Sequence, residues 1–429
     1  MASTGSSAQQ REELIDAKAA MALLGIKPQT LYAYVSRGLI RAVNNPGSKA
    51  SLYYRQDLDA LRLRGRTREA ARGTAERSLR VGGDAVLQTT ITGITPQGPL
   101  YRGLLATDLA LHGRPFESVV ELLCTGTLPA RSIPWAVLAP PEPFASFARA
   151  IAATAPSNNP RRIFALAIES LASCQGANAE LHAGAAILAA RQIIQVMTAA
   201  AGTLRERPAF EIPRAGETLA ALLTRAIGAP ADGPVAEVVN TALIVCADHE
   251  LAPSTFAARI AASAGADLYS CIGSALGAFE GLQTGLGCDL AEALLRECSS
   301  PARYAEALRA VAERKQPLPG YNHALYPEGD PRAAFLFDLV RRAGPAAPRG
   351  AFVLGCIKAA RDKLNASPGL SVAMAAVAVA FDLVPRSAGA LMAIGRTAGW
   401  VAHAFEQRMA GFLVRPRAEY VGPQVSRPL

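Results

Sequence analysis

Arginine and histidine side chains recur in three of four short motifs in the second half of the 429-residue sequence. The planar guanidinium of arginine forms paired hydrogen bonds with a carboxylate, so arginines held close together can bind a dicarboxylate. A single arginine is more often a surface ion-pair partner, which is why the order of the motifs matters. The motifs are ADHELAPSTFAAR (247–259), GAFEGLQTG (277–285), PGYNHALYPEGDPR (319–332) and GRTAGWVAH (395–403), with RPRAEY (415–420) after the last.

In this order, and with the triplet YRG (101–103) upstream, the motifs resemble those of the citrate synthase family over about residues 81–423. The resemblance implies an all-α, two-domain fold that dimerises, with the active site in the cleft between the domains. It implies condensation of acetyl-CoA, oxaloacetate and water to citrate and CoA, or of propionyl-CoA to methylcitrate. The partners to expect are an oxaloacetate- or citrate-like carboxylate and an acyl-CoA co-substrate, without a bound cofactor or metal.

The same resemblance assigns roles to five side chains. Arg332, Arg396 and Arg415 match the three arginines that bind the substrate carboxylates in the family. The counterpart of Arg415 reaches the active site of the other subunit. His249 and His323 match histidines that hydrogen-bond the keto acid, and His323 also matches the one that protonates its carbonyl.

Two positions that carry proton transfer in the family are substituted. In the stretch GLQTGL, Thr284 occupies the place of the histidine that stabilises the enol. In PGLSV, Ser371 stands where the family has the aspartate that removes the methyl proton. A serine hydroxyl is a poor base near neutral pH, and losing a positioned base costs on the order of 10²–10⁴ in rate. Since rescue by Asp289 or Asp362 is not expected, we predict a site that binds carboxylates but condenses weakly or not at all.

Three functions remain open on these residues. The first is a ligand-responsive regulator, in which closure of the body around a carboxylate repositions two DNA-binding heads. The second is an active citrate or methylcitrate synthase with an appended head. The third is a pseudo-subunit of a mixed dimer, which supplies Arg415 to an active paralogue. The substitutions favour binding without efficient catalysis and leave the enzyme question undecided.

The formal net charge of +9 is concentrated near the N-terminus. Residues 1–80 hold 14 Lys and Arg against 7 Asp and Glu, whereas the remaining chain is nearly neutral. A compact excess of positive charge indicates a polyanionic partner, and double-stranded DNA is the simplest one. A solvated basic face is the alternative.

This basic region has the pattern of a winged helix-turn-helix. Asp16 is a suitable N-cap for a helix that ends at Gly25, and Pro28 can begin a second helix running to Ser36. Extended segments with Asn-Pro-Gly between them predict a β-hairpin wing. The stretch LLGIKPQTLYAYVSRGLI…YYRQDLDAL resembles the DNA-reading domain of MerR-type regulators, and a small protein-interaction module is the alternative. The side chains expected to contact DNA are Gln29, Thr30, Tyr32, Arg37 and Arg41.

Composition supports a helical, globular body. Half of the residues are hydrophobic and only 6% are aromatic, which favours close-packed helices of Ala, Leu and Val. No apolar run is long enough to cross a bilayer, and seven single cysteines without a CxxC pair favour a reducing cytoplasm. His403 lies on a helix face and is expected to be structural. We expect a disordered tail (1–12), a MerR-like winged helix-turn-helix (13–66), a linker (67–82), a large domain (83–289 and 389–429) with a small hairpin pairing 89–92 with 99–102, and a small domain (290–388).

Overall fold

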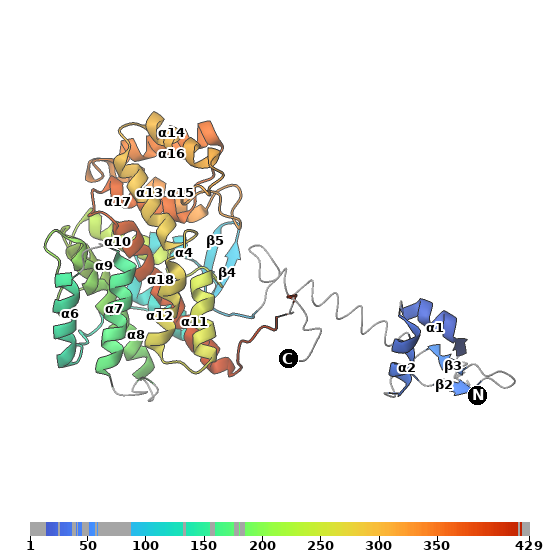
Figure 1. The fold of residues 1–429 in the computed structure, drawn as a ribbon. Helices are drawn as coiled ribbons and strands as arrows, with labels where there is room; N and C mark the ends of the chain where they lie inside the picture. Colours follow the sequence, from blue (N-terminus) through green and yellow to red (C-terminus); the bar gives the residue numbers. More distant parts are fainter. Residues whose placement is uncertain are drawn as a thin grey trace, which may run out of the picture. The chain divides into compact units, whose positions relative to one another are not determined.

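The structure is a computed structural model, and it divides into two compact units, Met1–Gln88 and Thr89–Leu429 (Figure 1). Predictions for the tail 1–12, the linker 67–82 and the side chains of Arg37 and Arg41 lie outside the described residues. The predicted division of the body into large and small domains remains a prediction. The described residues are 14–24, 26–36, 40, 42–44, 51–55, 58, 87–131, 134–154, 159–175, 180, 185–418 and 421–422.

In the described part of the N-terminal unit, two short helices accompany a three-stranded antiparallel sheet of order β1-β3-β2. The carboxylate of Asp16 accepts a hydrogen bond from the backbone N–H of Ala19 at 2.8 Å, so it caps the first helix as expected. The small core of this N-terminal unit contains Ala20, Leu31, Ile40, Tyr53 and Leu58. The elements are β1 (Leu14–Asp16), α1 (Ala17–Leu24), α2 (Pro28–Ser36), β2 (Ala42–Asn44) and β3 (Ser51–Tyr54).

The body is built from helices, and the local sequence explains where many of them begin. Proline, whose missing N–H costs nothing in a first helical turn, opens several of them, and side-chain caps precede others. The helices are α4 (Ala106–Leu111), α5 (Phe116–Thr125), α6 (Glu142–Thr154), α7 (Pro160–Cys174), α8 (Ala185–Ala200), α9 (Leu219–Ala226), α10 (Pro234–Val245), α11 (Pro253–Ser263), α12 (Leu268–Phe279), α13 (Gly285–Glu297), α14 (Pro301–Glu313), α15 (Pro331–Ala343), α16 (Gly350–Leu364), α17 (Leu370–Ala380) and α18 (Ser387–Ala410), with 3-10 turns η2 (Ala201–Leu204) and η3 (Gly344–Ala346).

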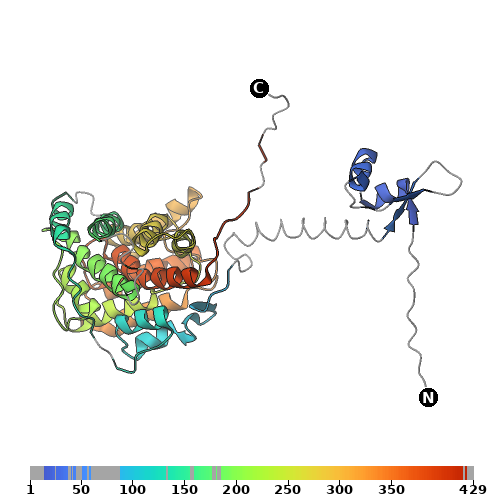
Figure 2. The ribbon, with the colours of Figure 1, turned by 90° about the horizontal axis from the view of Figure 1, so that it is seen from below.

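The long helix α18 lies in the middle of the body in two perpendicular views (Figures 1 and 2). It packs against α5, α7, α10, α11, α12, α13 and α17, and most of its residues from Ser387 to Ala404 are fully buried. Helices α14 to α17 gather at one end of the body, where α14 packs on α16 and α15 on α17. The core therefore surrounds one helix, and that helix carries Arg396.

A small antiparallel sheet stands at the start of the body: β4 (Thr92–Thr95), β5 (Gly98–Tyr101) and β6 (Leu104–Leu105). The predicted hairpin is present, but its first strand begins three residues later than expected. The reason is that Thr90 does not pair with a strand: its backbone N–H and its hydroxyl both donate to the carboxylate of Glu406, at 2.8 and 2.9 Å.

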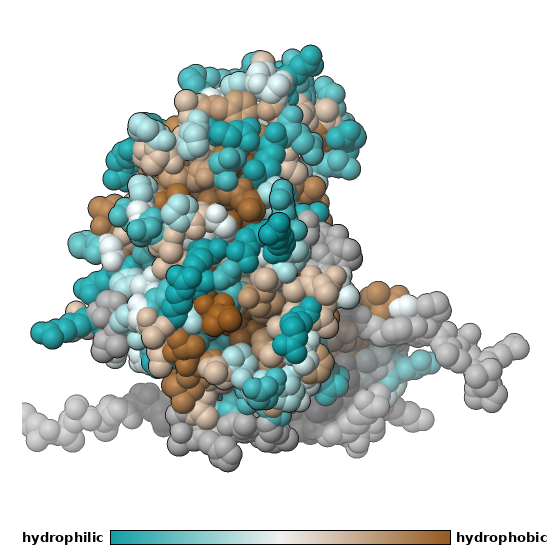
Figure 3. Space-filling view, turned by 90° about the vertical axis from the view of Figure 1, so that its left-hand side faces the viewer, coloured by the Kyte–Doolittle hydropathy of each residue, from teal (hydrophilic) through white to brown (hydrophobic). Residues whose placement is uncertain are grey.

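Hydrophobic side chains form one large buried cluster in the body, and all seven cysteines are free thiols. The stretch Ala185–Leu204 is long and apolar enough to cross a bilayer, but 67% of its most apolar window is buried inside the body, as in the core helix of a globular protein. Some large apolar side chains are exposed, and Figure 3 shows hydrophobic groups scattered among hydrophilic ones on one face.

Candidate functional site

Two glycines of α18 form a slot for the segment that carries His249. A side chain at Gly395 would place its Cβ 2.4 Å from the sulfur of Cys246, and one at Gly399 would place it 2.1 Å from Oδ1 of Asp248. Real Cβ atoms do not approach so closely, so glycine is required at both positions. The backbone N–H of Gly399 also donates to the carbonyl of Ala247 at 3.0 Å. The slot therefore fixes the position of His249 against the helix.

Arg396 lies between these glycines and is 4% exposed. Its Nε donates to the carbonyl oxygen of Cys246 at 2.9 Å, which orients the guanidinium. Burial lowers the pKa of Arg396, an effect that the nearby carboxylate of Asp248 opposes. No carboxylate forms an ion pair with Arg396 among the described residues, so its charge is available to an acidic ligand.

Arg332 sits in the first turn of α15 and is 1% exposed. The carboxylate of Asp330 caps this helix and also accepts hydrogen bonds from Arg332 Nε at 3.0 Å and Nη2 at 2.7 Å. Burial raises the pKa of Asp330, but the Arg332 guanidinium more than offsets this and holds the pKa below its usual value. The remaining nitrogen, Nη1, is buried and has no hydrogen-bond partner among the described residues.

A short loop presents His323 next to α17. Its preceding residue, Asn322, has a left-handed backbone (φ 57°) that asparagine tolerates better than most residues. Two hydrogen bonds join it to Ser367: Asn322 N–H to the Ser367 carbonyl at 2.7 Å, and Ser367 N–H to the Asn322 side chain at 2.9 Å. The backbone N–H of Leu325 donates to Nδ1 of His323 at 3.2 Å, so in the neutral ring the hydrogen lies on Nε2. His323 can therefore donate from Nε2 to a carbonyl oxygen.

The rings of His249, His323 and Tyr326 form a cluster. Their centroids lie 5.2 Å apart for the two histidines, 5.8 Å for His249 and Tyr326, and 5.6 Å for His323 and Tyr326. The guanidinium carbon of Arg332 lies 5.8 Å from the centre of the Tyr326 ring. The structure therefore brings together four of the predicted site residues: His249, His323, Arg332 and Arg396. Arg396 belongs to this group because its charge helps to lower the pKa of His249.

Three polar atoms in this cluster are buried without a hydrogen-bond partner among the described residues: His249 Nε2, the Tyr326 hydroxyl and Arg332 Nη1. Buried polar groups are nearly always hydrogen-bonded in native proteins. Burial, Arg332 and Arg396 together hold the pKa of His249 well below 6.5, so its ring is neutral at neutral pH. Neutral donors beside buried arginines suit a ligand that carries carboxylate and carbonyl oxygens.

The substituted positions contribute little to this chemistry. The hydroxyl of Thr284 lies 2.9 Å from the carbonyl of Phe279 and 3.0 Å from that of Gly281, so its single proton is used within its own turn. Ser371 lies in the first turn of α17, where the nearest polar contact of its hydroxyl is the sulfur of Met392 at 4.0 Å. Neither position carries an imidazole or a carboxylate.

Arg161 is a buried residue beside Thr284 that sequence reasoning missed. It is 1% exposed and pairs with Asp289 at 2.7 Å and Glu280 at 3.3 Å. A Cβ at Gly285 would lie 2.6 Å from the Arg161 side chain, which explains the glycine after Thr284. Asp289 is thus occupied by an ion pair. Asp362 is exposed and pairs with Lys358.

Other predicted residues lie apart from the cluster. Arg415 is exposed in the segment after α18 and makes no hydrogen bond or ion pair with another described residue. In the N-terminal unit, Gln29 and Tyr32 are exposed on α2 and Thr30 is partly buried. Tyr326 and Asp330 lie in the motif 319–332, but the sequence did not identify them as site residues. The structure does so, because Asp330 pairs with Arg332 and the Tyr326 ring lies beside those of His249 and His323.

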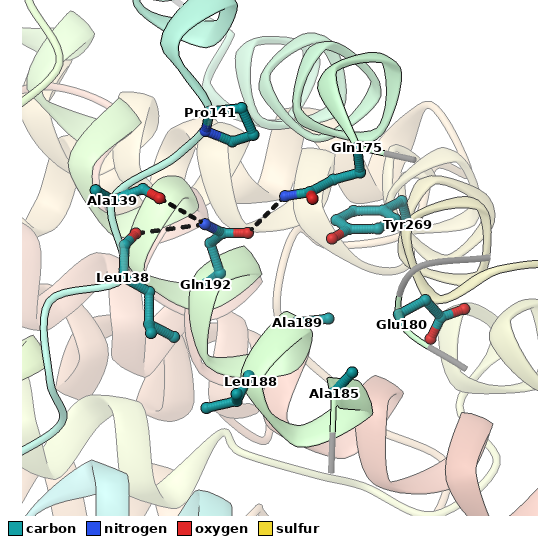
Figure 4. Close-up of a pocket in the computed structure, with 10 residues that line it drawn as sticks. All are labelled: Leu138, Ala139, Pro141, Gln175, Glu180, Ala185, Leu188, Ala189, Gln192 and Tyr269. Carbon is teal, nitrogen blue, oxygen red and sulfur yellow. Dashed lines mark hydrogen bonds between the residues drawn. The ribbon is translucent and has the colours of Figure 1, made fainter. Parts of the chain in front are cut away.

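Two hollows of the body are lined by other residues. One of about 570 Å³ has apolar walls from α6, the end of α8 and residues 208–213. The other, of about 330 Å³, is shown in Figure 4, where Gln175 donates to Gln192 at 3.0 Å and Gln192 donates to the carbonyl of Ala139 at 3.1 Å. Neither includes a residue of the histidine–arginine cluster, and no group of metal-binding side chains occurs among the described residues.

The body is helical and contains a buried histidine–arginine cluster, and comparison with known proteins gives its family. The chain belongs to the citrate synthase family, whose C-terminal domain matches residues 81–417.

Curated relatives include citrate synthase 2 of Bacillus subtilis, 32% identical over 190 residues, which are 44% of this chain and 51% of that protein. The 2-methylcitrate synthase of Shewanella oneidensis is 31% identical over 191 residues, which are 43% and 50% of the two chains. The chain spans about half the length of the curated relatives it matches.

Solved structures of citrate synthases share the fold. The enzyme of Thermoplasma acidophilum, in a ternary complex with carboxymethyl coenzyme A and oxaloacetate, superposes with a TM-score of 0.67 at 23% identity, over 80% of this chain and 96% of that one. The citrate synthase of Thermotoga maritima has a TM-score of 0.64 at 21% identity, over 82% and 98%.

Proposed function

We propose that the body binds a small keto dicarboxylate of the oxaloacetate or citrate kind, with an acyl-CoA as second ligand. The observation that carries this proposal is the convergence of three buried polar groups, on His249, Tyr326 and Arg332, that have no hydrogen-bond partner among the described residues. Arg396 adds a buried positive charge beside them. The complex of the Thermoplasma acidophilum citrate synthase with oxaloacetate and a CoA derivative supports the ligand class.

Condensation by this body is weakened or lost. The protein acts instead as a regulator that responds to the binding of its ligand. Citrate formation needs a base for the acyl methyl group and a donor for the enol. The Thr284 hydroxyl is used within its own turn, and Ser371 offers no carboxylate. His323 keeps its capacity to donate to the keto group.

Calorimetry tests the binding of the carboxylate, and a thiol-release assay tests the loss of condensation. Oxaloacetate is expected to bind the parent protein and to bind Arg396→Gln at least about 10-fold more weakly, because a charged hydrogen-bond donor is lost. Arg303→Gln, an exposed arginine on α14, is the matched control. With acetyl-CoA or propionyl-CoA added, free thiol is expected at well below the median enzyme turnover of about 10 s⁻¹. Absence of oxaloacetate binding would refute the ligand assignment.

An active citrate or methylcitrate synthase is the second candidate, and it is favoured by the relatives that carry these names. Turnover near the median rate in homogeneous protein would establish it and overturn the impaired-site proposal. A third candidate is a subunit of a mixed dimer with an active paralogue. Arg415, exposed and unpaired among the described residues, supports a role across an interface. Thiol release that requires the co-expressed paralogue would establish this candidate.

A homodimer is the proposed assembly of the regulator. Exposed leucines on three helices are apolar side chains available to a second subunit: Leu166 on α7, Leu188 on α8, and Leu286 and Leu290 on α13. Sedimentation equilibrium is expected to give a dimer, and Leu188→Glu with Leu290→Glu is expected to give a monomer.

Double-stranded DNA is the proposed partner of the N-terminal unit. The exposed Gln29 and Tyr32 on α2 and the basic excess of residues 1–80 support this proposal. Replacing Gln29, Arg37 and Arg41 with Ala should weaken DNA affinity and reduce its dependence on salt. DNA binding that persists without residues 1–80 would refute the assignment.

A further inference from the structure

A buried line of hydrogen bonds follows one face of α18 away from the carboxylate site. Arg396, His403 and Gln407 are separated by seven and four residues, so they lie on the same side of the helix. His403 is completely buried, and so is the Asp248 carboxylate that it contacts. The line leaves the site through His403, which was expected from the sequence to be structural.

Four side-chain contacts make up the line. Nε2 of His403 lies 3.2 Å from Oδ2 of Asp248, and Nδ1 of His403 lies 3.3 Å from Nη1 of Arg259. Arg259 is 1% exposed and donates from Nη1 to Glu406 at 2.7 Å and from Nε to Gln407 at 3.0 Å. Thr90 fixes the outer end, because two of its groups donate to Glu406.

The direction of these hydrogen bonds follows from arginine. A guanidinium has only donors, so Nδ1 of His403 must accept from Arg259 and its hydrogen must lie on Nε2. The Nε2–H group then donates to Asp248. A hydrogen on Nδ1 would instead set two donors against each other in the contact between His403 and Arg259. With Nδ1 accepting from Arg259, the Nε2–H group of His403 is oriented toward Asp248.

Asp248 connects this line to the ligand-binding side chains. It directly precedes His249, and its charge acts on Arg396. Burial raises the pKa of Asp248, but His403 and Arg396 more than offset this and keep the group ionised. Its Oδ1 lies against Gly399 in the slot of α18, with no hydrogen-bond partner among the described residues. His403 thus supplies one of the few contacts that hold this carboxylate.

We propose that His403 and Arg259 are positioning residues of the carboxylate site. By fixing Asp248, they set the position of His249 and the charge balance around Arg396. The proposal rests on the proposed ligand function, because its effect is read in the binding of a keto dicarboxylate. It assigns no contact between His403 and the ligand itself.

Two replacements of His403 separate positioning from simple packing. His403→Phe keeps the ring volume and removes both hydrogen bonds, whereas His403→Gln keeps a donor that can reach Asp248. Thr397→Val is the matched control, since it removes a buried hydroxyl of the same helix whose partners are the carbonyl of Ala393 and the sulfur of Met197. Oxaloacetate affinity by calorimetry is expected to fall at least about 10-fold in His403→Phe, to recover largely in His403→Gln, and to remain unchanged in Thr397→Val.

The ligand-free parent protein provides a second measurement. Nitrogen-15 NMR is expected to show His403 with its hydrogen on Nε2 and none on Nδ1. Equal oxaloacetate affinity in the parent and His403→Phe would overturn the proposal, and so would a hydrogen on Nδ1. If His403→Phe does not fold, the oxaloacetate affinity of His403→Gln and the NMR spectrum of the parent still test the proposal. A parent that binds no oxaloacetate would refute the proposed function, while the NMR measurement would still test the arrangement of His403.

Discussion

Both carboxylate oxygens of Asp330 bind the guanidinium of Arg332, at 3.0 Å to Nε and 2.7 Å to Nη2, and Nη1 has no hydrogen-bond partner among the described residues. Asp330 also accepts from the backbone N–H of Arg332 at 3.0 Å, so the same side chain starts α15. The arginine is therefore held in one orientation before any ligand arrives, which reduces the entropy lost on binding.

Replacing Arg332 with Gln should affect both binding and stability. Asp330 would remain buried without its partner, which typically costs about 3–5 kcal/mol. Oxaloacetate affinity should fall about 10- to 100-fold through the lost charged donor. The matched control is Arg341→Gln on the same helix, where the partner Asp338 is exposed and the stability change should stay within about 1 kcal/mol. Urea unfolding and calorimetry measure the two effects, and equal behaviour of the two variants would contradict the prediction.

Tyr326→Phe and Tyr304→Phe should have opposite effects. The Tyr326 hydroxyl has no hydrogen-bond partner among the described residues, so its removal should leave stability unchanged and weaken oxaloacetate binding by about 0.5–1.5 kcal/mol. The Tyr304 hydroxyl contacts that of Tyr321 at 3.1 Å, in the core. Its removal should lower the melting temperature and leave binding intact. A loss of affinity in both variants would argue against a ligand contact by Tyr326.

Restoring the family residues should raise condensation. Thr284→His with Ser371→Asp supplies an enol donor and a base, and recovering a base alone is worth on the order of 10²–10⁴ in rate. The measurement is thiol release from acetyl-CoA, with each single variant as the control. No gain in the double variant would mean that these two positions do not face the acyl group.

Gly399→Ala should be destabilising, although alanine is the better helix former. Its Cβ would meet Oδ1 of Asp248 at 2.1 Å, so the carboxylate must leave the slot. We expect a loss of about 1–3 kcal/mol by overpacking, together with weaker oxaloacetate binding. Gly277→Ala on α12 is the control: no atom lies within 4 Å of the new Cβ, so stability should rise by about 0.5–1 kcal/mol. Chemical denaturation of both variants checks the difference.

Stability should fall as the pH drops from about 7.5 to about 5.5. Burial and Arg332 lower the pKa of both His249 and His323 in the folded protein, whereas in the unfolded chain these rings titrate near 6.5. The unfolded state therefore takes up protons first, and unfolding becomes more favourable as the pH falls. The urea midpoint should shift less with pH in His249→Asn. A midpoint that does not change over this range would contradict the prediction.

Local signals in the sequence predicted several features well. Pro28 and Ser36 bound the second helix as expected, and the capping role of Asp16 is present, because both depend on neighbouring residues. The ordered motifs identified His249, His323, Arg332 and Arg396 as site residues. The contacts among these side chains could not be predicted from the sequence.

Long-range contacts account for what the sequence did not reveal. The strand after Thr90 starts late because its partner, Glu406, lies 316 residues away. Arg161 is separated from Asp289 by 128 residues, and no local pattern links them. His403 was expected to be structural, and its two contacts with Asp248 and Arg259 come from elements that only the folded chain brings together.

The two glycines of α18 also limit how the chain can vary in length. Gly395 and Gly399 face Cys246 and Asp248 one helical turn apart, and Arg396 follows the first of them directly. Inserting one residue between Ser387 and Gly395 would rotate every later position of the helix by about 100° and turn the glycines and the arginine away together. Length changes in this family should therefore collect outside α18, for example in the exposed segment 411–418, where no such register has to be kept.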